Sequence, residues 1–463
     1  MRKIFSPSKK NLFKVAAFGL PLMFFNVNPT VVFSEDLKEA LAFAYQNNPD
    51  LLAARANLRK VDEGVPAARS GWRPTVTSNL SIGFSQANSD SNGVSSDTTN
   101  VPGSISLSVN QSVYDGGRTK ISIRQAETNV QGERSRLFTA EQKVLLDGAI
   151  AFVDVISARS VVELQTNNLK RLEKQLEATK ERFKVGEVTR TDVAQAEARV
   201  DRAKADKIKA TGDLTSSNST YNRVFGKQAG ELEAPEEVKN LPSEITEAVN
   251  FALENNFSLI AAKFEELAAL DSVALSKSGL RPNVTITGSA SHSDTSGDTD
   301  SSSSSLSLNA NINIPLYQAG AVYSGIRSAK EEANRRRILV ESTRRNVIET
   351  SSKAFSSWRT AKAPAEALAA EVASAEIALE GVEQEALVGA RTVLDVLDAE
   401  QERLSAQVRL VRANRDTFVA AYSLLSALGK LTAKGLELPV EIYDYDKNFI
   451  RVRNFCLLYT SDA

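Results

Sequence analysis

The sequence is poor in the residues on which most enzymes and disulfide-bonded domains depend. Its 463 residues include a single cysteine and a single histidine, and only 6% are aromatic. The one cysteine, Cys456, has no partner for an internal disulfide. The one histidine, His292, lies in a Ser- and Asp-rich stretch without companions for a metal site, and we treat it as solvated. Since no glycine-rich phosphate loop is present either, the sequence predicts neither an enzyme nor a bound cofactor or metal.

The sequence also lacks an excess of positive or negative charge. Lys and Arg total 56 against 57 for Asp and Glu, and the net charge is −1. Without a dominant basic patch, nucleic acid is not an expected partner. The hydrophobic fraction of 42% and the abundance of Ala, Glu, Lys, Arg and Leu favour long helices over a mixed globular core.

Long apolar runs are confined to the N-terminus. Basic residues that include Arg2 and Lys3 precede an apolar run at residues 15–25, and Ser34 precedes Glu35. This pattern is typical of a secretory signal peptide, here residues 1–34. The alternative, a membrane anchor, is disfavoured because the run is shorter than the about 20 residues of a spanning helix. No later run reaches that length, so a membrane crossing by this chain would use strands.

The sequence contains an internal duplication. Gly-Trp-Arg-Pro at residues 71–74 returns as Gly-Leu-Arg-Pro at residues 279–282. The pattern Val-Gly-x-x-Thr-x-x-Asp-Val-x-x-Ala-Glu at residues 185–197 returns at residues 388–400. A period near 200 residues is too long for a solenoid and indicates duplication of one whole structural unit. We therefore expect one repeat over residues 35–228 and a second over residues 242–430.

Each repeat contains two segments of alternating polarity, at about residues 74–114 and 282–317. Ile105, Leu107 and Val109 alternate with serine, and Leu306 and Leu308 do the same in the second repeat. A period of two over about 10 residues is typical of a membrane-spanning strand. The uncharged Ser, Asn and Thr face suits the water-filled side of a pore. A soluble β-sandwich has strands of the same pattern and is the alternative.

The strand number requires an oligomer. Residues 88–100 and 291–305 are rich in Ser, Asp, Gly and Thr, so we expect long exterior loops there, which leaves four strands. Four strands cannot close a barrel, and an open edge in lipid leaves backbone groups unpaired. Protomers must therefore pool strands: two copies would give a narrow barrel, and three would give a wider one of twelve strands.

Most of the remaining sequence favours helix. About 66 residues follow Arg118, and a similar stretch follows Val322, each a path of about 100 Å when helical. Shorter helices are expected to return from about Thr191 and Val393. Pro364 lies within the second long path and predicts a kink or break. A soluble coiled coil has the same periodicity, but it does not explain a strand pair in each repeat.

Together these features resemble the TolC family of outer-membrane efflux proteins over nearly the whole mature chain. The motifs that carry the resemblance are residues 47–51 (Asn-Asn-Pro-Asp-Leu), 71–74, 114–117 (Tyr-Asp-Gly-Gly) and 388–399 (Val-Gly-Ala-Arg-Thr-Val-Leu-Asp-Val-Leu-Asp-Ala). The resemblance implies a mixed α and β membrane protein that forms a homotrimer in the outer membrane. Each protomer would give four strands to a twelve-stranded transmembrane β-barrel and long helices to a periplasmic α-helical barrel.

The resemblance also implies partners. These are outer-membrane lipid, a periplasmic adaptor (membrane fusion) protein, and an inner-membrane transporter of the ABC or RND type. The protein would serve drug efflux or type I protein secretion. Two alternatives differ in their strands: a periplasmic coiled-coil adaptor would carry small β-domains beside one hairpin, and a solute porin would need many more strands per chain.

A gate at the hairpin tips is a further implication. Thr191, Asp192 and Arg391 match the residues that hold the periplasmic entrance shut, and Asp395 and Asp398 match the carboxylates at its narrowest part. Because Asp395 and Asp398 are three residues apart on one helix face, three copies would form a ring of about six carboxylates that favours cations. A helix N-cap or a solvated helix face is the alternative for Asp192 and Asp395.

The sequence also suggests roles for the two hairpin tips and for the C-terminal residues. The tip residues Val185, Gly186, Val388 and Gly389 are expected to contact the adaptor. Ala386 stands where the family has a bulky aromatic, so that part of the closing network is absent. Residues 431–463 are expected to be a C-terminal tail, of which residues 456–463 resemble translated sequencing-adapter DNA.

Overall fold

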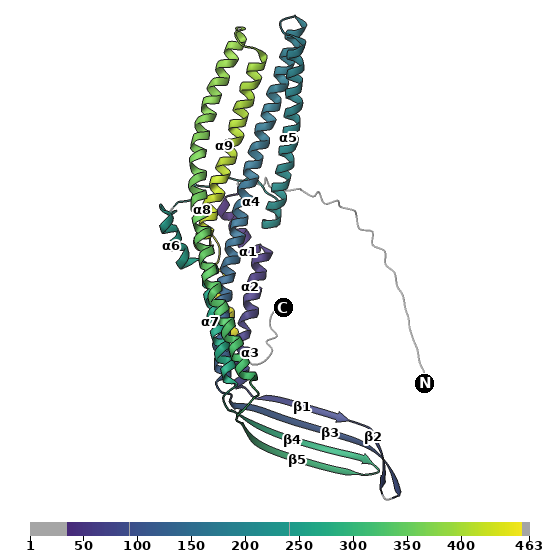
Figure 1. Cartoon of the computed structure of the whole chain (residues 1–463). Coiled ribbons are helices and arrows are strands. Elements are labelled where there is room, and N and C mark those ends of the chain that lie inside the picture. Colours follow the sequence, from purple (N-terminus) through teal and green to yellow (C-terminus); the bar gives the residue numbers. More distant parts are fainter. Residues whose placement is uncertain (1–34, 92, 240, 456–463) are drawn as a thin grey trace, which may run out of the picture.

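The computed structural model describes residues 35–91, 93–239 and 241–455 of the chain. Two long helical hairpins stand at one end of an elongated molecule, and a curved antiparallel sheet extends from the other end (Figure 1). The expected signal peptide at residues 1–34 and the unusual residues 456–463 lie outside the described part. Within that part, no helix is both long and apolar enough to span a membrane.

The two hairpins match each other closely. The first joins α4 (Arg118–Lys184) to α5 (Arg190–Phe225), and the second joins α8 (Ala321–Leu387) to α9 (Val393–Ala427). Helices α4 and α8 each contain 67 residues, and each is about 100 Å long at about 1.5 Å per residue. The two long helical paths predicted from the sequence are therefore confirmed.

Pro364 does not interrupt its helix. The break expected there is wrong, because α8 continues through the proline. Thr417 of α9 donates its hydroxyl to the carbonyl of Ala361 at 2.9 Å, one turn before the proline. The neighbouring helix thus supplies a polar partner near the place where the proline ring disturbs the backbone ladder.

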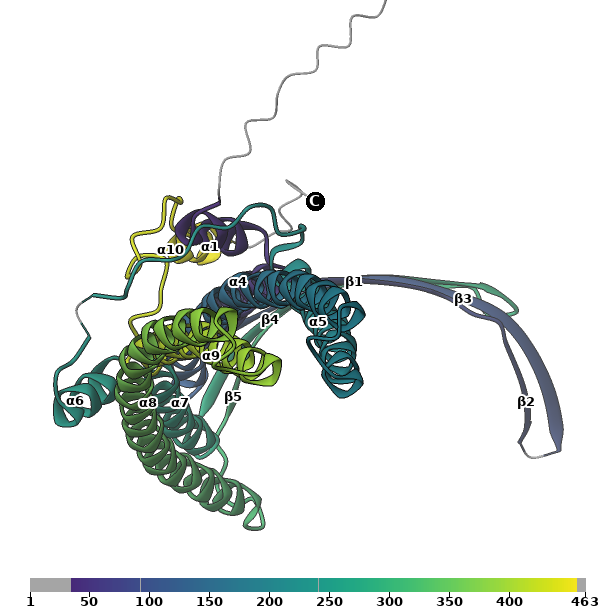
Figure 2. The ribbon, with the colours of Figure 1, turned by 90° about the horizontal axis from the view of Figure 1, so that it is seen from above.

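Short helices precede each hairpin. In the first repeat they are α1 (Leu37–Asn47), α2 (Pro49–Asp62), α3 (Gly64–Arg69) and the 3-10 helix η1 (Ser70–Trp72). In the second repeat they are α6 (Ile245–Asn255) and α7 (Phe257–Ser278). Seen from above, the long helices follow a curved wall, with α1 and α10 (Tyr445–Val452) together on one side of it (Figure 2).

Two asparagines at equivalent positions join these short helices to the hairpins. Asn48 caps α2, because its Oδ1 accepts from the backbone N–H of Asp50 at 3.0 Å. Asn256 caps α7 in the same way. Each side-chain amide also donates to the last turn of a returning helix, Asn48 to the carbonyl of Val224 at 2.9 Å and Asn256 to that of Ala427 at 3.2 Å. The duplicated Asn-Asn motif is thus a link between the short helices and the hairpins.

Replacing Asn48 with alanine is expected to lower the free energy of unfolding by about 1–2 kcal/mol, because both the cap and the partner of a buried carbonyl are lost. Asn256→Ala should cost less, since Asn256 is only half-buried. Thermal dissociation in detergent measures both. Asn47→Ala is the control, because the Asn47 amide bonds only within its own exposed turn; a loss as large as that of Asn48→Ala would contradict the cap assignment.

The main hydrophobic core lies where α1, α2 and α4 meet the ends of α5 and α9. Its fully buried members include Leu41, Phe152 and Tyr221. Residues 431–455, expected to be a tail, pack into this core: Leu431 is fully buried, and the backbone N–H of Ala433 donates to the buried carboxylate of Glu141 at 2.7 Å. Burial raises the pKa of Glu141. The end of the chain is therefore part of the fold of its first repeat.

The sheet is antiparallel throughout. Its strands are β1 (Thr75–Ile82), β2 (Ser85–Ser91), β3 (Val94–Tyr114), β4 (Asn283–Gly297) and β5 (Ser301–Asn313). They follow the order β1-β3-β4-β5, and β2 continues the line of β1 along the far part of β3. Helical crossovers thus place the strand pairs of the two repeats side by side through the β3–β4 contact.

The register of strand pairing places apolar side chains on one face of the sheet and hydroxyl side chains on the other. Opposed residues such as Val76 with Val109, Leu107 with Ala290, and Ala290 with Leu306 form an apolar face. On the other face, serine and threonine hydroxyls pair across the strands at 2.6 to 2.8 Å; these pairs are Thr77–Ser108, Ser81–Ser104, Ser289–Ser307, Ser291–Ser305 and Ser293–Ser303. The alternation predicted from the sequence is therefore present.

The long exterior loops predicted at residues 88–100 and 291–305 are wrong. Most of these residues are strand, because β3 begins at Val94, β4 runs to Gly297 and β5 begins at Ser301. Backbone pairing and the serine–serine contacts order segments that bury little apolar surface. His292 lies in β4, and its Nδ1 is 2.9 Å from Ser304 Oγ.

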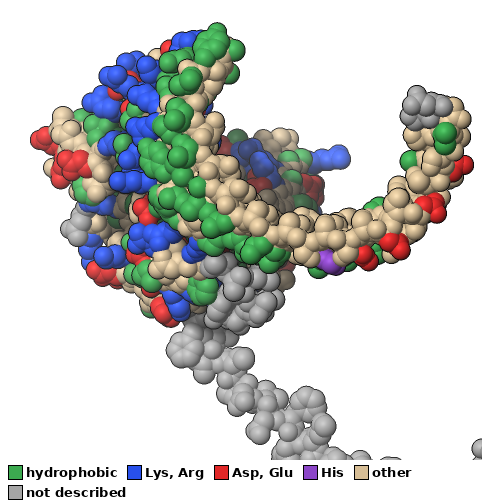
Figure 3. Space-filling view, turned by 90° about the horizontal axis from the view of Figure 1, so that it is seen from below, with side chains coloured by type: hydrophobic (Ala, Val, Ile, Leu, Met, Phe, Trp, Pro, Cys, Tyr) green, Lys and Arg blue, Asp and Glu red, His purple; other side chains and the backbone are tan. Residues whose placement is uncertain are grey.

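No lysine or arginine occurs in residues 75–114 or 283–313. In Figure 3 the arm formed by the strands accordingly shows apolar, uncharged and acidic side chains, whereas basic side chains gather over the helices. The strands thus carry no positive charge, whereas the helices carry charges of both signs.

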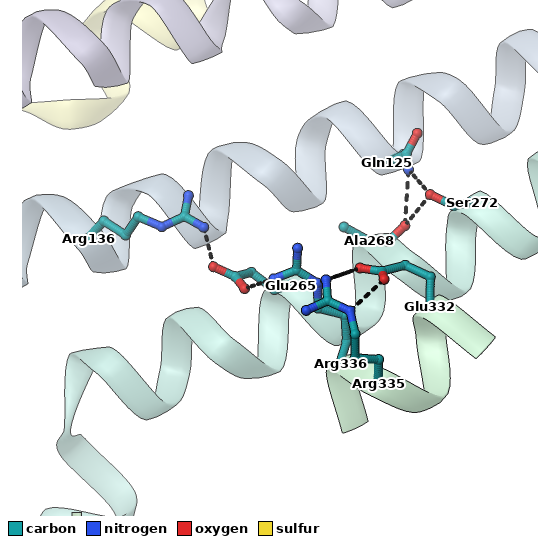
Figure 4. A network of polar contacts seen from close by, with 8 residues as sticks. All are labelled: Gln125, Arg136, Glu265, Ala268, Ser272, Glu332, Arg335 and Arg336. Atoms are coloured by element: carbon teal, nitrogen blue, oxygen red, sulfur yellow. Dashed lines mark hydrogen bonds and ion pairs between the residues drawn. The ribbon is translucent and has the colours of Figure 1, made fainter. Parts of the chain in front are cut away.

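A polar network joins α4, α7 and α8 near the base of the sheet (Figure 4). Glu265 of α7 receives hydrogen bonds from Arg136 of α4 and from Arg336 of α8. Arg336 also pairs with Glu332 at 2.9 Å. Arg336 is half-buried, and its contact with Glu265 ties α8 to α7.

The arginines of the two Gly-x-Arg-Pro motifs fix the junction between helices and strands. Arg281 donates to the carbonyl of Gly116 at 2.9 Å, which holds the start of α4 against the start of β4. Arg73 donates to the carbonyls of Asn454 at 2.9 Å and Phe455 at 2.6 Å. The second motif therefore anchors the start of α4 in the first repeat, and the first motif anchors residues 454 and 455.

Candidate functional site

The candidate site is built from the two hairpin tips, which lie at the end of the molecule opposite the sheet (Figure 1). Gly186 and Gly389 have positive φ values of 82° and 79°, a conformation that glycine adopts without strain. The preceding valines, Val185 and Val388, are 72% and 80% exposed. Each tip therefore presents an apolar side chain beside a tight glycine turn.

A capping box starts the returning helix at both tips. The backbone N–H and hydroxyl of Thr189 donate to Asp192 at 2.7 and 2.8 Å, and Thr392 makes the same two bonds to Asp395, both at 2.8 Å. These hydrogen bonds, first the backbone bond and then the hydroxyl bond, hold the pKa of both aspartates below the ordinary value. The N-cap residue at each tip is thus the threonine, and the aspartate, for which an N-cap was the alternative, is instead the third residue of the capping box. Thr191 lies exposed beside Asp192 in the first turn.

An ion pair spans the turn at each tip, and the order of its basic and acidic residues is reversed between the two tips. Arg182 precedes the first turn and contacts Glu187 after it at 3.1 Å. In the second tip the acidic residue comes first, and Glu385 contacts Arg391 at 2.7 Å. The contact with Glu385 raises the pKa of Arg391. Within the protomer, Arg391 is therefore held in its own tip.

Asp398 reaches the first hairpin. Its Oδ1 is 2.5 Å from Arg199 Nη2 of α5, and the Asp398 side chain is 58% exposed. Two residues later, Glu400 is buried between Arg171 of α4 at 3.2 Å and Arg403 at 3.1 Å. Asp395 and Asp398 share one helix as predicted, but Asp395 is the N3 residue of a capping box and Asp398 is paired with an arginine.

Sequence reasoning missed Arg199, Arg171 and Glu400. Arg199 is 199 positions from its partner Asp398, and Arg171 is 229 positions from its partner Glu400. The signal that remains in the sequence is the duplication itself, because Arg199 corresponds to Glu402 in the second repeat and thus departs from the repeat pattern.

Long paired hairpins, joined to a sheet that has one apolar and one uncharged polar face, define an outer-membrane channel protomer. A family model described as "Outer membrane efflux protein" matches residues 41–226 and 248–430, which include both repeats. The chain belongs to this outer membrane efflux protein family, and the TolC-family resemblance predicted from the sequence is confirmed.

Curated relatives agree over most of the chain. The chain is 35% identical to the outer membrane efflux protein BepC of Brucella suis over 423 residues, which are 91% of each sequence. It is 26% identical to the outer membrane protein TolC of Escherichia coli over 420 residues, which cover 87% of this chain and 84% of the relative.

Solved structures show the same fold. The CmeC outer membrane channel of Campylobacter jejuni matches with a TM-score of 0.75 at 16% identity, covering 90% of this chain and 89% of that one. CusC, a protein described with transmembrane channel formation, matches with a TM-score of 0.73 at 19% identity and covers 86% and 93%. The predicted mixed α and β fold class is confirmed.

The protein is therefore an outer-membrane channel component of efflux or type I secretion, located in the outer membrane and extending into the periplasm. The adaptor alternative is not favoured. The relatives are channel proteins rather than enzymes, which supports the non-enzyme interpretation through family membership.

Proposed function

We propose that three copies of this chain form the channel. Each chain contributes four strands, with β1 and β2 counted as one, so that twelve strands close a barrel in the outer membrane. The hairpins form a tunnel in the periplasm. The observation that carries the proposal is the open sheet. Within the described residues, β1 pairs only with β3 and β5 only with β4, so both outer edges are free. Free edges are not tolerated in lipid, and pairing β5 of one copy with β1 of the next removes them.

The two faces of the sheet support a lipid-facing exterior and a water-filled interior. Leu80, Leu306 and Leu308 are 77%, 87% and 78% exposed in the protomer, as lipid-facing side chains would be. The hydroxyl-lined face would form the wall of the pore. The two structural repeats, proposed as residues 35–228 and 242–430, would each supply one pair of strands to the barrel and one helical hairpin to the tunnel.

The hairpin tips are the proposed contact for a periplasmic adaptor, which links the channel to an inner-membrane transporter of the ABC or RND type. Exposed Val185 and Val388, with Gly186 and Gly389 beside them, offer a small apolar knob on each tip. Six such knobs would ring the entrance of a trimer, a pattern that a helical adaptor tip can fill.

The gate is proposed to involve Thr191, Asp192, Arg391, Asp395 and Asp398. Asp395 and Asp398 lie one turn apart on α9, near the tip. Asp395 would present its charge to the entrance, because its cap partners are neutral. Asp398 would contribute less, since Arg199 offsets its charge. We therefore propose a gate with a weaker cation preference than six free carboxylates would give.

Expression in cells that lack the native copy tests the function. The full chain should enter the outer-membrane fraction as a heat-modifiable trimer and conduct ions in planar bilayers. Copurification with an adaptor and a transporter should follow when the tips are intact, and Val388→Asp should weaken it. A soluble monomer without conductance would overturn the proposal.

Asp395→Asn is expected to lower the preference of the channel for potassium over chloride, because it removes one negative charge per protomer from the entrance. The reversal potential in a potassium chloride gradient measures the change. Glu349→Gln removes the same charge about 60 Å away along the hairpin and is the control. Equal shifts in the two variants would contradict the gate assignment.

The preference should also persist in mild acid. Because the pKa of Asp395 is held below its ordinary value, the carboxylate stays charged as the pH falls from neutral into the usual range of aspartate. The contribution of Asp395 to cation selectivity should be lost only at pH values below the usual pKa range of aspartate. A loss of selectivity nearer neutral pH would point to another group.

A further inference from the structure

Two buried carboxylates hold residues 431–455 to the first repeat. Glu141 of α4 is 5% exposed, and its Oε1 accepts a hydrogen bond from the backbone N–H of Ala433 at 2.7 Å. Asp62 of α2 is fully buried, and its Oδ2 accepts from the side-chain amide of Asn448 in α10 at 2.7 Å. The two carboxylates are therefore acceptors for two separate parts of the same docked segment.

Neither carboxylate forms an ion pair with any residue that the structure describes. Arg55 of α2 is the cation that acts on Glu141. The guanidinium of Arg55, however, donates to the carbonyl of Tyr45 at 2.9 Å and stacks on the rings of Tyr45 and Tyr443. In the described part of the chain, Asp62 Oδ1 is buried without a hydrogen-bond partner. Both negative charges are thus buried with little compensation.

The charges around Asp62 partly cancel one another. Arg134 of α4 favours the charged form of Asp62, whereas Glu63 of α2 and Asp446 of α10 disfavour it. Arg134 is itself paired with Asp446 at 2.5 Å. Asp62 therefore shares this cation with a second carboxylate.

Burial makes both carboxyl groups weaker acids in the docked state. Burial raises the pKa of Glu141, against smaller lowering effects of the Ala433 N–H and the Arg55 charge. Burial likewise raises the pKa of Asp62, against the hydrogen bond that it accepts and the charge of Arg134. A group with a raised pKa binds its proton more tightly in the docked state than when it is released into water. Docking is therefore stabilised as the pH falls, and this stabilisation is lost as the pH rises through the raised pKa.

The duplication connects these carboxylates with the docked segment. By the offset that relates the two tip glycines, Glu141 corresponds to Arg344 in the second repeat. By the offset that relates the two Gly-x-Arg-Pro motifs, Asp62 corresponds to Leu270. Both Arg344 and Leu270 are exposed. The buried carboxylates at these two positions thus belong to the repeat that receives residues 431–455.

We propose that residues 431–455 and the first repeat form a proton-sensitive latch, in which proton uptake by Glu141 and Asp62 strengthens the docking of the segment and proton loss weakens it. The latch lies within one protomer, so it does not rest on the proposed trimer. Because the helices extend into the periplasm, the pH of the periplasm would set how firmly the end of the chain is held.

Hydrogen exchange of the full-length protein in detergent measures the latch. Mass spectrometry follows the peptides that contain Ala433 and Asn448 between about pH 5 and about pH 8. Each exchange rate is divided by the intrinsic rate at the same pH, so that the result reports local opening. The protection of both peptides should be severalfold higher at the acidic end of this range.

Glu141→Gln is the direct test, because glutamine keeps an acceptor for Ala433 but has no charge to titrate. The Ala433 peptide should then be as protected at neutral pH as it is in acid in the unmodified protein, and most of its pH dependence should be lost. Glu163→Gln, at an exposed position of the same helix, is the matched control and should keep the original pH dependence.

Asp62→Asn gives an independent measurement, which also serves if Glu141→Gln does not fold. It should reduce the pH dependence of the Asn448 peptide severalfold and should leave that of the Ala433 peptide in place. Protection that is constant over the pH range in the unmodified protein would overturn the proposal. Equal pH dependence in the unmodified protein and in Glu141→Gln would overturn it as well, whether or not the protein forms channels.

Discussion

Replacing Leu308 with arginine should prevent assembly of the channel in the membrane. Leu308 lies in the middle of β5 on the apolar face, opposite Gly288 of β4. An arginine on the lipid side of a barrel costs about 2–4 kcal/mol near the bilayer centre, and the proposed trimer would carry three copies. The variant is expected to lose the heat-modifiable trimer band and to leave the outer-membrane fraction.

The neighbouring residue provides a matched control. Ser307 belongs to the same strand, but its hydroxyl lies 2.7 Å from Ser289 on the opposite, polar face. Ser307→Arg should still assemble, since an arginine in the pore remains hydrated, and it should shift ion selectivity toward chloride. If both variants assemble equally well, the assignment of the two faces is wrong.

Phe152→Ala should cause the largest loss of stability in the helical part. Phe152 of α4 is fully buried in the main core. Truncating a buried phenylalanine costs about 3–5 kcal/mol through lost transfer free energy and a residual cavity. The temperature at which the detergent-solubilised trimer dissociates should fall markedly. Phe183→Ala, at a 44% exposed position near a tip, should cost about 1 kcal/mol or less.

A large effect of Phe183→Ala combined with a small effect of Phe152→Ala would place the core elsewhere. Unfolding in denaturant, followed by circular dichroism, separates the two cases because the midpoint and the slope report stability and exposed surface independently. An unchanged slope with a lower midpoint is expected for Phe152→Ala.

Periodicity predicted the long elements of this fold well. The 67-residue helices, their glycine turns and the alternating strands all follow from patterns repeated over many residues. The extent of the strands was not predicted, because runs such as residues 301–305 have no apolar side chain to mark a face. Their order depends on pairing with β4, which no local pattern reveals.

The tips show a similar division. Thr189 with Asp192 and Thr392 with Asp395 form local motifs, and the sequence alone suggested caps for these aspartates. The partner of Asp398 was not predictable in this way, because Arg199 belongs to the other hairpin. Contacts between distant segments depend on how helices pack, and single-sequence patterns contain little of that information.

The packing of residues 431–455 against the first repeat has a consequence for biogenesis. Arg55 of α2 stacks between Tyr45 and Tyr443, at 4.5 and 5.0 Å from the ring centroids, and Leu431 completes the core around α1 and α4. The core of the first repeat therefore stays incomplete until residues 431–455, which follow both hairpins in the sequence, are available to pack. The first repeat thus cannot complete its fold before the second hairpin has been synthesised.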